Sequence, residues 1–280
     1  MTLAMAWVRK GAGGVDELVT VSDSRLNGGG RNFDCVPKIL PLKRNDSIIC
    51  FAGETDFAYP LMLQLSLAIE GHFPAVSRAV DMTKIAGFTI RTFNQMLKEI
   101  DPYVKGQHVP KTEFILAGYS WQQKSFKIWR VIYNKGVNLF ELKPCSVWHG
   151  PFKSIAFAGD WAREAEKQLY RLMTDRYGDI RILKEGCLDM EPFEVLRNIL
   201  RAGKRHDTVG GAPQMVKVYC YPNARPVGIF WPDRAAERVY LLGRQLLLEE
   251  KNIDFWQLNP DTLDVEHPLH SRTATGAGAA

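Results

Sequence analysis

The sequence predicts an α+β protein in which helices and sheets lie in separate layers. Some segments alternate apolar and polar residues with a period of two, which is typical of half-buried strands. Others repeat apolar residues three or four positions apart, which is typical of helices. The composition agrees with a globular fold, because the 280 residues are 46% hydrophobic and 24% charged. A chain of this length and composition can bury one large core.

The first part of the chain is expected to form four strands followed by two helices. The predicted strands lie at 3–8, 17–22, 38–42 and 47–52. We expect these four strands to form one sheet, with the first two paired as a hairpin. Apolar side chains then recur at helical spacing over 57–71 and again over 93–100, so two helices would cover that sheet.

The second part is expected to form another sheet and another pair of helices. Its predicted elements are strands at 113–117, 126–133, 139–142 and 154–158, helices at 160–175 and 192–203, and strands at 215–220 and 239–247. The strand at 154–158 would close the second sheet. We interpret residues 1–265 as a single domain. Residues 266–280 are small, polar and without apolar periodicity, and they are typical of a flexible tail.

Charge, cysteine content and histidine spacing narrow the class of protein. The net charge of +5 is spread along the chain without a run of like charges, which argues against nucleic-acid binding. The chain has 5 cysteines, which is an odd number, and none of them has C-x-x-C spacing. This is typical of reduced cytoplasmic thiols. With no signal peptide and no long apolar run, we expect a cytoplasmic protein without membrane contact. The histidines lack zinc spacing, so no metal or cofactor is predicted.

The residue with the most distinctive chemistry is Thr2. Met1 is usually trimmed before a small residue, and Thr2 would then carry a free α-amine beside its own hydroxyl. A threonine hydroxyl alone is too weakly acidic to attack a carbonyl, whereas an α-amine with a pKa near ~8 can accept its proton close to neutral pH. Thr2 is therefore a candidate nucleophile with a base in the same residue.

Three short motifs follow Thr2 in an order that resembles a known superfamily. They are Asp23-Ser24-Arg25, Pro37-Lys38-Ile39 and Phe51-Ala52-Gly53. Together with Thr2 they resemble the N-terminal nucleophile hydrolases, and within these the proteasome β-subunit group with its simpler bacterial relatives. The spacing from Asp23 to Lys38 fits the hairpin of that family, and the glycine-rich turn at 11–14 absorbs the longer stretch before Asp23.

The resemblance implies a role for each motif residue. Lys38 would lie beside the Thr2 hydroxyl and lower its pKa, and the Asp23 carboxylate would hold the lysine ammonium charged and oriented. The backbone N–H of Gly53 would form the oxyanion hole. Only a residue without Cβ lets a substrate carbonyl come so close to the main chain.

A block far downstream matches the family in part. His206-Asp207-Thr208-Val209-Gly210-Gly211 resembles its Asp-x-x-Ser-Gly-Gly motif, which makes Asp207 the carboxylate that supports the threonine amine. Gly210, however, replaces the serine of that motif. Phe157-Ala158-Gly159 is the best match to a Gly-Ser-Gly turn of the family, and Ala158 replaces its serine. Two hydroxyls that would steady the amine and a nearby water are therefore absent.

The resemblance also implies an architecture, a substrate and an assembly. The fold would be a four-layer αββα sandwich. Leu26, Asn27, Phe51 and Thr55 match positions that line the substrate groove and the pocket next to the scissile bond, which the bulky Phe51 would shorten. The run 27–31 lacks the lysine of a P-loop and is interpreted as a hairpin turn at the edge of this cleft.

The implied protein is a threonine-type peptidase that acts on peptides or unfolded proteins. Its subunits would assemble into a homo-oligomeric ring or spiral, with an ATP-dependent unfoldase as a further partner. Exposed aromatic side chains are expected to contribute surface for these contacts, among them Trp121, Trp129 and Trp148.

Each candidate residue also has an ordinary structural interpretation. Asp23 could serve as a turn residue and Lys38 as a solvated charge at a sheet edge. Gly53 could mark a junction between strand and helix, with Thr55 as the helix N-cap. Asp207, beside two glycines, could belong to a turn. These alternatives stay open at the level of sequence.

Two other functions compete with the peptidase. The first is a catalytically silent proteasome-like subunit with a role in assembly, which the replacements at Ala158 and Gly210 support. The second is an amidase that acts on a small, non-peptide amide with the same fold. The state of the N-terminus separates the enzymes from the silent subunit, because an N-terminal nucleophile needs Met1 to be removed.

Overall fold

The computed structural model of the chain has a mixed α/β fold, with largely antiparallel sheets and five α-helices in the part that it describes. That part comprises residues 2–10, 14–100, 109–145, 152, 154–179, 188–204, 207–221, 223–252 and 254–267. The fold is compatible with the predicted α+β class. Met1 and most of the predicted glycine-rich turn lie outside the described residues.

The first sheet has five strands in the order β10-β1-β2-β11-β12, all antiparallel. These strands are β1 (Ala4–Lys10), β2 (Asp16–Ser22), β10 (Ile155–Ala158), β11 (Gln214–Tyr219) and β12 (Asn223–Pro226). Side chains along β1 alternate between two buried clusters. Met5 and Trp7 belong to one cluster, and Ala4 and Ala6 belong to the other. Because successive side chains of a strand point to opposite faces, β1 is buried on both sides.

The second sheet also has five antiparallel strands, in the order β5-β6-β7-β8-β9. These strands are β5 (Ile39–Pro41), β6 (Ser47–Gly53), β7 (Thr112–Ser120), β8 (Ser125–Asn134) and β9 (Leu139–Pro144). Ile48 and Cys50 of β6 share a buried cluster with Ala4 and Ala6 of the first sheet. The two sheets therefore pack face to face, with small side chains of β1 between them.

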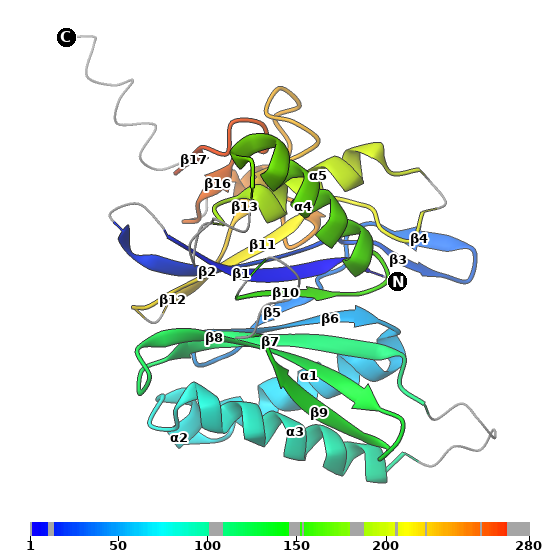
Figure 1. The fold of residues 1–280 in the computed structure, drawn as a ribbon, viewed down its shortest axis with the longest axis vertical. Helices are drawn as coiled ribbons and strands as arrows, with labels where there is room; N and C mark the ends of the chain where they lie inside the picture. The colour runs from blue at the N-terminus through cyan, green and yellow to red at the C-terminus, as the bar shows by residue number, and fades with distance from the viewer. Residues whose placement is uncertain are drawn as a thin grey trace.

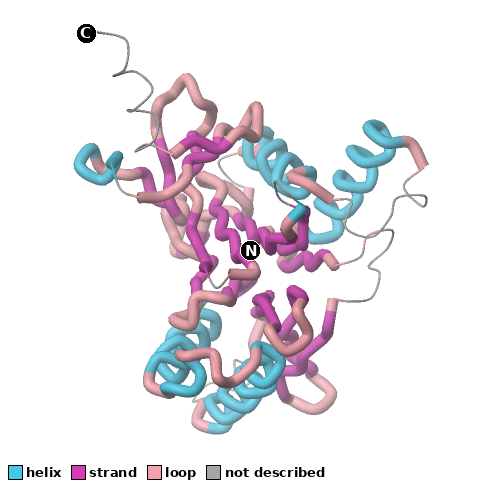
Figure 2. Tube along the Cα trace, turned by 90° about the vertical axis from the view of Figure 1, so that its left-hand side faces the viewer, coloured by secondary structure: helices cyan, strands magenta, loops and turns pink. Residues whose placement is uncertain are grey.

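Helices cover the other face of each sheet. The helices are α1 (Thr55–Glu70), α2 (Phe73–Val76), α3 (Met82–Lys98), α4 (Ala162–Tyr177) and α5 (Glu191–Ala202). Helices α4 and α5 share a cluster with Met5 and Trp7 of β1, whereas α1 and α3 share one with Ile49 and Phe51 of β6. Figure 1 shows these helix pairs beyond the two sheets, and Figure 2 shows the strands between them. None of the described helices is long and apolar enough to cross a membrane.

Two smaller sheets complete the fold. Strands β3 (Leu26–Gly28) and β4 (Arg31–Phe33) form a hairpin, as the run 27–31 predicted. The third five-stranded sheet has the order β15-β14-β13-β16-β17. Its strands are β13 (Gly228–Phe230), β14 (Val239–Leu241), β15 (Arg244–Gln245), β16 (Gln257–Leu258) and β17 (Val265–Glu266), with a 3₁₀ helix at Leu248–Asn252. Ile229 and Leu258 of this sheet lie in the cluster that holds α4 and α5.

The pairing of strands differs from the sequence prediction. The strands predicted at 3–52 do not form one sheet, because β1 and β2 pair with β10 and β11 while β5 and β6 pair with β7. Strand β10 closes the first sheet rather than the second, with Ala158 opposite Ala4. The predicted strand at 239–247 is a hairpin of β14 and β15. Alternation shows that a strand is buried, but its partner is decided by packing between distant segments.

The end of the described chain lies slightly beyond the predicted domain boundary at residue 265. Glu266 belongs to β17, and His267 is only 8% exposed. The Nε2 atom of His267 lies 2.8 Å from Asp254 Oδ1. The rest of the predicted tail, from residue 268 onward, lies outside the described residues.

Asp81 caps the start of α3, and its replacement is expected to destabilise the fold. Its Oδ2 accepts hydrogen bonds from Thr83 N at 2.9 Å and from the Ser120 hydroxyl at 3.0 Å. Burial acts to raise the pKa of Asp81, but these hydrogen bonds bring it below the ordinary 3.8. Loss of an N-cap costs about 1–2 kcal/mol, so Asp81→Ala should lose that much free energy of unfolding in urea at neutral pH.

The same contribution depends on pH in a defined direction. Because the folded-state pKa of Asp81 lies below 3.8, its stabilisation is present above that value and is lost as the pH falls through the folded-state pKa. Asp175→Ala is the control, since Asp175 is exposed on α4 and its loss should change stability by no more than about 0.5 kcal/mol. Equal losses in the two variants would show that the cap contributes nothing.

Candidate active site

The β1–β2 hairpin brings Thr2 and Asp23 to the same end of the first sheet. Ala4 pairs with Ser22 in the register of the two strands. Just beyond this pair, Asp23 N donates to Leu3 O at 3.2 Å, and Leu3 N donates to Asp23 Oδ1 at 3.1 Å. The hairpin predicted from alternation is thereby confirmed, and it places the residue before β1 next to the residue after β2.

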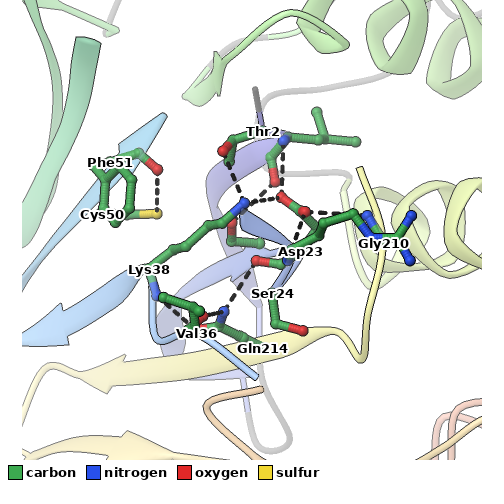
Figure 3. A network of polar contacts seen from close by, with 12 residues as sticks. Thr2, Asp23, Ser24, Val36, Lys38, Cys50, Phe51, Gly210 and Gln214 are labelled. Carbon is green, nitrogen blue, oxygen red and sulfur yellow. Dashed lines mark hydrogen bonds and ion pairs between the residues drawn. The ribbon is translucent and has the colours of Figure 1, made fainter. Parts of the chain in front are cut away.

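Lys38 completes a cluster of three buried polar side chains (Figure 3). Its Nζ donates to Thr2 Oγ1 at 2.8 Å and to Asp23 Oδ1 at 2.8 Å. Thr2, Asp23 and Lys38 are each 0% exposed. The structure therefore brings together the three residues that the sequence predicted as nucleophile, orienting carboxylate and lysine. It rules out the alternative that Lys38 is a solvated charge at a sheet edge.

Burial sets the electrostatics of this cluster. The Asp23 carboxylate also accepts hydrogen bonds from Arg25 N at 3.1 Å and Gly210 N at 3.2 Å. Burial raises the pKa of Asp23, opposed by Lys38 and by the backbone N–H groups of Leu3 and Gly210. Burial likewise lowers the pKa of Lys38, opposed by Asp23. Lys38 is thus easier to deprotonate than a surface lysine, because a buried site disfavours its charge.

Gln214, the first residue of β11, forms hydrogen bonds to the segments that contain Asp23 and Lys38. This fully buried side chain donates from Nε2 to Asp23 O at 3.0 Å and to Val36 O at 2.7 Å. Its Oε1 accepts a hydrogen bond from Lys38 N at 3.0 Å. Sequence reasoning missed Gln214, and its only signal is a polar residue at the start of an apolar strand.

Cys50 lies close to Lys38 but is not a competing nucleophile. Its side chain is fully buried in β6 between the two sheets. Burial raises the pKa of the Cys50 thiol to about 12, with Lys38 acting in the opposite direction. The thiolate is the reactive form of cysteine, so a thiol with this pKa stays protonated and inert near neutral pH.

Gly53 ends β6 at a point that admits no side chain. Its φ is 112°, and a Cβ would collide with Lys111 O and lie 2.9 Å from Thr112 Cα. Gly159 is similarly restricted, since its Cβ would collide with Thr2 O and lie 3.3 Å from Ala52 Cβ. Ala52, directly before Gly53, is therefore near Thr2. The oxyanion role of the Gly53 N–H stays a prediction, and the glycine has a structural reason as well.

Glu113 of β7 is a second residue that sequence reasoning missed. It pairs with Ala52 in the second sheet, and its Oε1 accepts a hydrogen bond from Gly159 N at 2.7 Å. Arg130 Nη2 donates to Glu113 Oε2 at 2.6 Å. Glu113 thus fixes the loop that touches Thr2. Its signal in the sequence is a single charge ahead of the apolar run at 114–117.

Arg25 occupies the space that a serine at position 210 would need. A Cβ on Gly210 would collide with the guanidinium of Arg25, whose Nε would be 2.5 Å away. Arg25 is held there by Asp34, to which Nε and Nη2 donate at 2.6 and 2.7 Å. A side chain at position 210 is therefore incompatible with the present position of Arg25. Ala158, where the resemblance predicts the other missing serine, is 1% exposed in β10.

The hydrogen bonds of Asp207 in the structure join it to Lys204 and Arg25. Its Oδ2 accepts from Lys204 N at 2.6 Å, and its backbone oxygen accepts from Arg25 Nη1 at 3.1 Å. None of the hydrogen bonds found among the described residues joins Asp207 to Thr2. The predicted support of the threonine amine by Asp207 stays a prediction, and the turn interpretation agrees with the contact to Lys204.

The four predicted substrate residues have different surroundings. Phe51 is 0% exposed, and its ring packs against Tyr59 at a centroid distance of 5.1 Å. Leu26 is partly buried against the apolar cluster that contains Phe51. Asn27 is exposed on the β3–β4 hairpin, which borders a cavity of about 660 Å³. Thr55 is partly buried and opens α1, but the N-cap is Glu54, so the interpretation of Thr55 as the cap is wrong.

Comparison with known families and with curated proteins found no match for this chain. No model of a known protein family matches it, and no curated protein is similar to it at a significant level. The likeness to N-terminal nucleophile hydrolases therefore depends on the motifs and on the geometry of this chain alone.

Removal of the Asp23 carboxylate alone should destabilise the fold strongly, whereas removal of both charges of the Lys38–Asp23 pair should not. Asp23→Asn leaves a buried ammonium without its carboxylate, and breaking a buried pair in this way costs about 3–5 kcal/mol. The double variant Asp23→Asn/Lys38→Met should lose much less, because no uncompensated charge remains. Urea unfolding measures both.

A solvent-exposed ion pair provides the control for this prediction. The side chains of Arg234 and Glu266 are 45% and 46% exposed. Glu266→Gln should therefore change the free energy of unfolding by less than about 1 kcal/mol. If the double variant is as unstable as Asp23→Asn, the loss does not come from the unpaired charge.

Proposed function

We propose that this protein is an N-terminal-threonine hydrolase of amide bonds, related in fold and mechanism to the proteasome β-subunit group. The observation that carries the proposal is the position of Lys38 Nζ, 2.8 Å from both Thr2 Oγ1 and Asp23 Oδ1 in a fully buried cluster. Two sheets packed face to face, with helices on their outer faces, support assignment to the four-layer αββα sandwich of that superfamily.

The proposed reaction begins once Met1 is removed. The Thr2 amine takes the proton of its own hydroxyl as Oγ1 attacks the substrate carbonyl. The Lys38 ammonium, oriented by Asp23, stabilises the charge that develops on Oγ1, while the Gly53 N–H donates to the oxyanion. The protonated amine then gives its proton to the leaving nitrogen, and the C–N bond breaks. Water, deprotonated by the same amine, hydrolyses the resulting ester and regenerates Thr2.

The substrates that we propose are peptides or unfolded proteins with a small residue before the scissile bond. Phe51 matches the family position at the base of the pocket for that residue. Its side chain is fully buried against Tyr59 in the cluster that contains α1 and α3, and in the proposed site it would close the base of this pocket. A bulky substrate side chain would have to displace a packed aromatic ring, which costs packing energy.

A second candidate is a catalytically silent subunit on the same fold, with a role in assembly. It is favoured by the two missing hydroxyls at Ala158 and Gly210, and by the contact of Asp207 with Lys204. Without these groups the Thr2 amine lacks the side chains that would steady it. The silent subunit keeps the buried ion pair as a structural element only.

The test of the hydrolase is the state and reactivity of Thr2. Intact mass of the purified protein should show that Met1 is removed. An epoxyketone or β-lactone probe should modify the protein at Thr2, and Thr2→Ala should abolish this labelling. Retained Met1 without a probe adduct would refute the hydrolase and favour the silent subunit.

The pH dependence of labelling gives a second measurement in the same experiment. The rate should rise as the α-amine loses its proton near ~8, and fall again as Lys38 loses its own. Because burial lowers the pKa of Lys38 from 10.5, the fall should begin below that value. Asp23→Asn removes a charge that raises this pKa, so it should move the fall to lower pH. An unchanged profile would exclude Lys38 from the reaction.

Self-association is a further part of the proposal, by analogy with the rings or spirals of the family. Leu63 and Leu67 on α1 are 55% and 60% exposed, and Phe73 on α2 is 80% exposed. Of the predicted aromatic residues, Trp121 is 49% exposed, Trp129 packs partly against the core, and Trp148 lies outside the described residues. Exposed apolar side chains of this size favour contacts between copies.

Light scattering at micromolar protein concentration tests the assembly. We expect a mass of several subunits, and Leu67→Glu should lower it because it places a charge in the apolar contact. Leu139→Glu is the matched control, since Leu139 is exposed on β9 rather than on α1. A monodisperse monomer for the unmodified protein would refute the proposed ring or spiral.

A further inference from the structure

The turn between β14 and β15 has an unusual backbone. Leu242 and Gly243 have φ values of 49° and 87°, and they join strands in which Leu241 pairs with Arg244. Positive φ at both central residues is the requirement of a type I′ turn, one of the two-residue turns of hairpins, and it normally selects Asn or Gly. Leucine rarely adopts such a backbone, and strained residues persist only where the surrounding structure holds them.

Both residues of this turn contact the centre of the molecule. The side chain of Leu242 packs against the cluster between the two large sheets. Gly243 lies against the candidate site, since a Cβ on it would be 2.5 Å from Ser24 Cβ and 3.3 Å from Gln214 Nε2. The third sheet therefore reaches the residue that directly follows Asp23.

Ser24 is enclosed from its other side as well. Its side chain is 0% exposed, and its Oγ lies 2.8 Å from Ala212 O and 3.0 Å from Asp34 O. A Cβ on Gly211 would collide with this Oγ. Ser24 is thus held between two glycines and two carbonyl groups, so a change at either glycine must move it.

Movement of Ser24 would reach the ion pair through the main chain. Ser24 N donates to Gly210 O at 3.1 Å, and Gly210 N donates to Asp23 Oδ2. Gln214 Nε2, which would lie 3.3 Å from a Cβ on Gly243, donates to Asp23 O. The Asp23 carboxylate is therefore connected to the turn in two ways. One is the peptide bond to Ser24, and the other is the buried side-chain amide of Gln214.

From these contacts we propose that the β14–β15 turn is a positioning element of the active site. Gly243 holds Ser24 in place, so that the Asp23 carboxylate stays within hydrogen-bonding distance of Lys38. Leu242 anchors the turn in the core between the sheets. The inference rests on the proposed function of Thr2, Asp23 and Lys38, and it assigns the C-terminal sheet a role in that function.

Gly243→Ala tests the proposal. Misplacing a catalytic group by about 1 Å costs about 100-fold in rate, so we expect kcat to fall by that order while KM is unchanged. Gly178→Ala is the matched control, because Gly178 has a φ of 79° but nothing within 4 Å of its added Cβ. The control also places alanine at a positive φ, but without the contact, and should keep its kcat.

The contact itself is tested by a double-mutant cycle with Ser24→Gly, which removes the atom that the added Cβ at position 243 would meet. Gly243→Ala should lower kcat much less in the Ser24→Gly background than in the unmodified protein. Equal losses in both backgrounds, or an equal loss in Gly178→Ala, would overturn the proposal.

A readout independent of turnover separates this inference from the proposed function. The buried Lys38 ammonium should give its own ¹⁵N NMR resonance, which should shift in Gly243→Ala and stay unchanged in Gly178→Ala. An unshifted resonance refutes the positioning role, whereas a shifted resonance without turnover in the unmodified protein refutes only the hydrolase. If Gly243→Ala does not fold, Leu242→Ala keeps the glycine but removes the anchor, and the same outcomes apply.

Discussion

The buried contact between Lys38 and Asp23 is the interaction on which the rest of the site depends. Taking two such charges out of water costs several kcal/mol for each, and their attraction offsets this only when further hydrogen bonds satisfy both groups. The Asp23 carboxylate receives those bonds from the backbone of Leu3, Arg25 and Gly210. These donors lie on segments far apart in the chain. The ion pair is therefore favourable only when the segments next to β1, β2 and β11 are in place, so the fold and the site depend on each other.

This dependence explains which features could be predicted from the sequence. Thr2 and Asp23 are joined by one hairpin, which the alternation in β1 and β2 predicts, and the motif resemblance predicts that the two residues meet. The pairing of β10 with β1, or of β6 with β7, has no local signal, because any buried strand shows similar alternation. The turn of β14 and β15 was missed for a related reason. The positive φ of Leu242 is imposed by tertiary contacts and has no signal in the sequence. The apolar pattern over 239–247 therefore predicts one strand instead of two.

Within the site, the residues with reactive chemistry could be predicted, whereas those that hold them could not. Gln214 and Glu113 satisfy backbone groups of distant segments, and neither residue type indicates such a role before the fold is known. Asp207 illustrates the converse limit. A motif match gives a position in the sequence, but the direction of the side chain is decided by its neighbours, and this carboxylate bonds to Lys204 N.

The absence of a side chain at position 210 is matched to the position of Arg25. A side chain there would displace Arg25 and break its two hydrogen bonds to Asp34, while the present Gly210 lets Arg25 pack close and still donates its N–H to Asp23. Backbone donors thus fix the carboxylate, but they offer no hydroxyl to the Thr2 amine. In the proposed mechanism that amine must act with less assistance, and it exists only after Met1 is removed. Because Thr2 directly follows Met1, the proposed chemistry depends on a single processing step at the N-terminus.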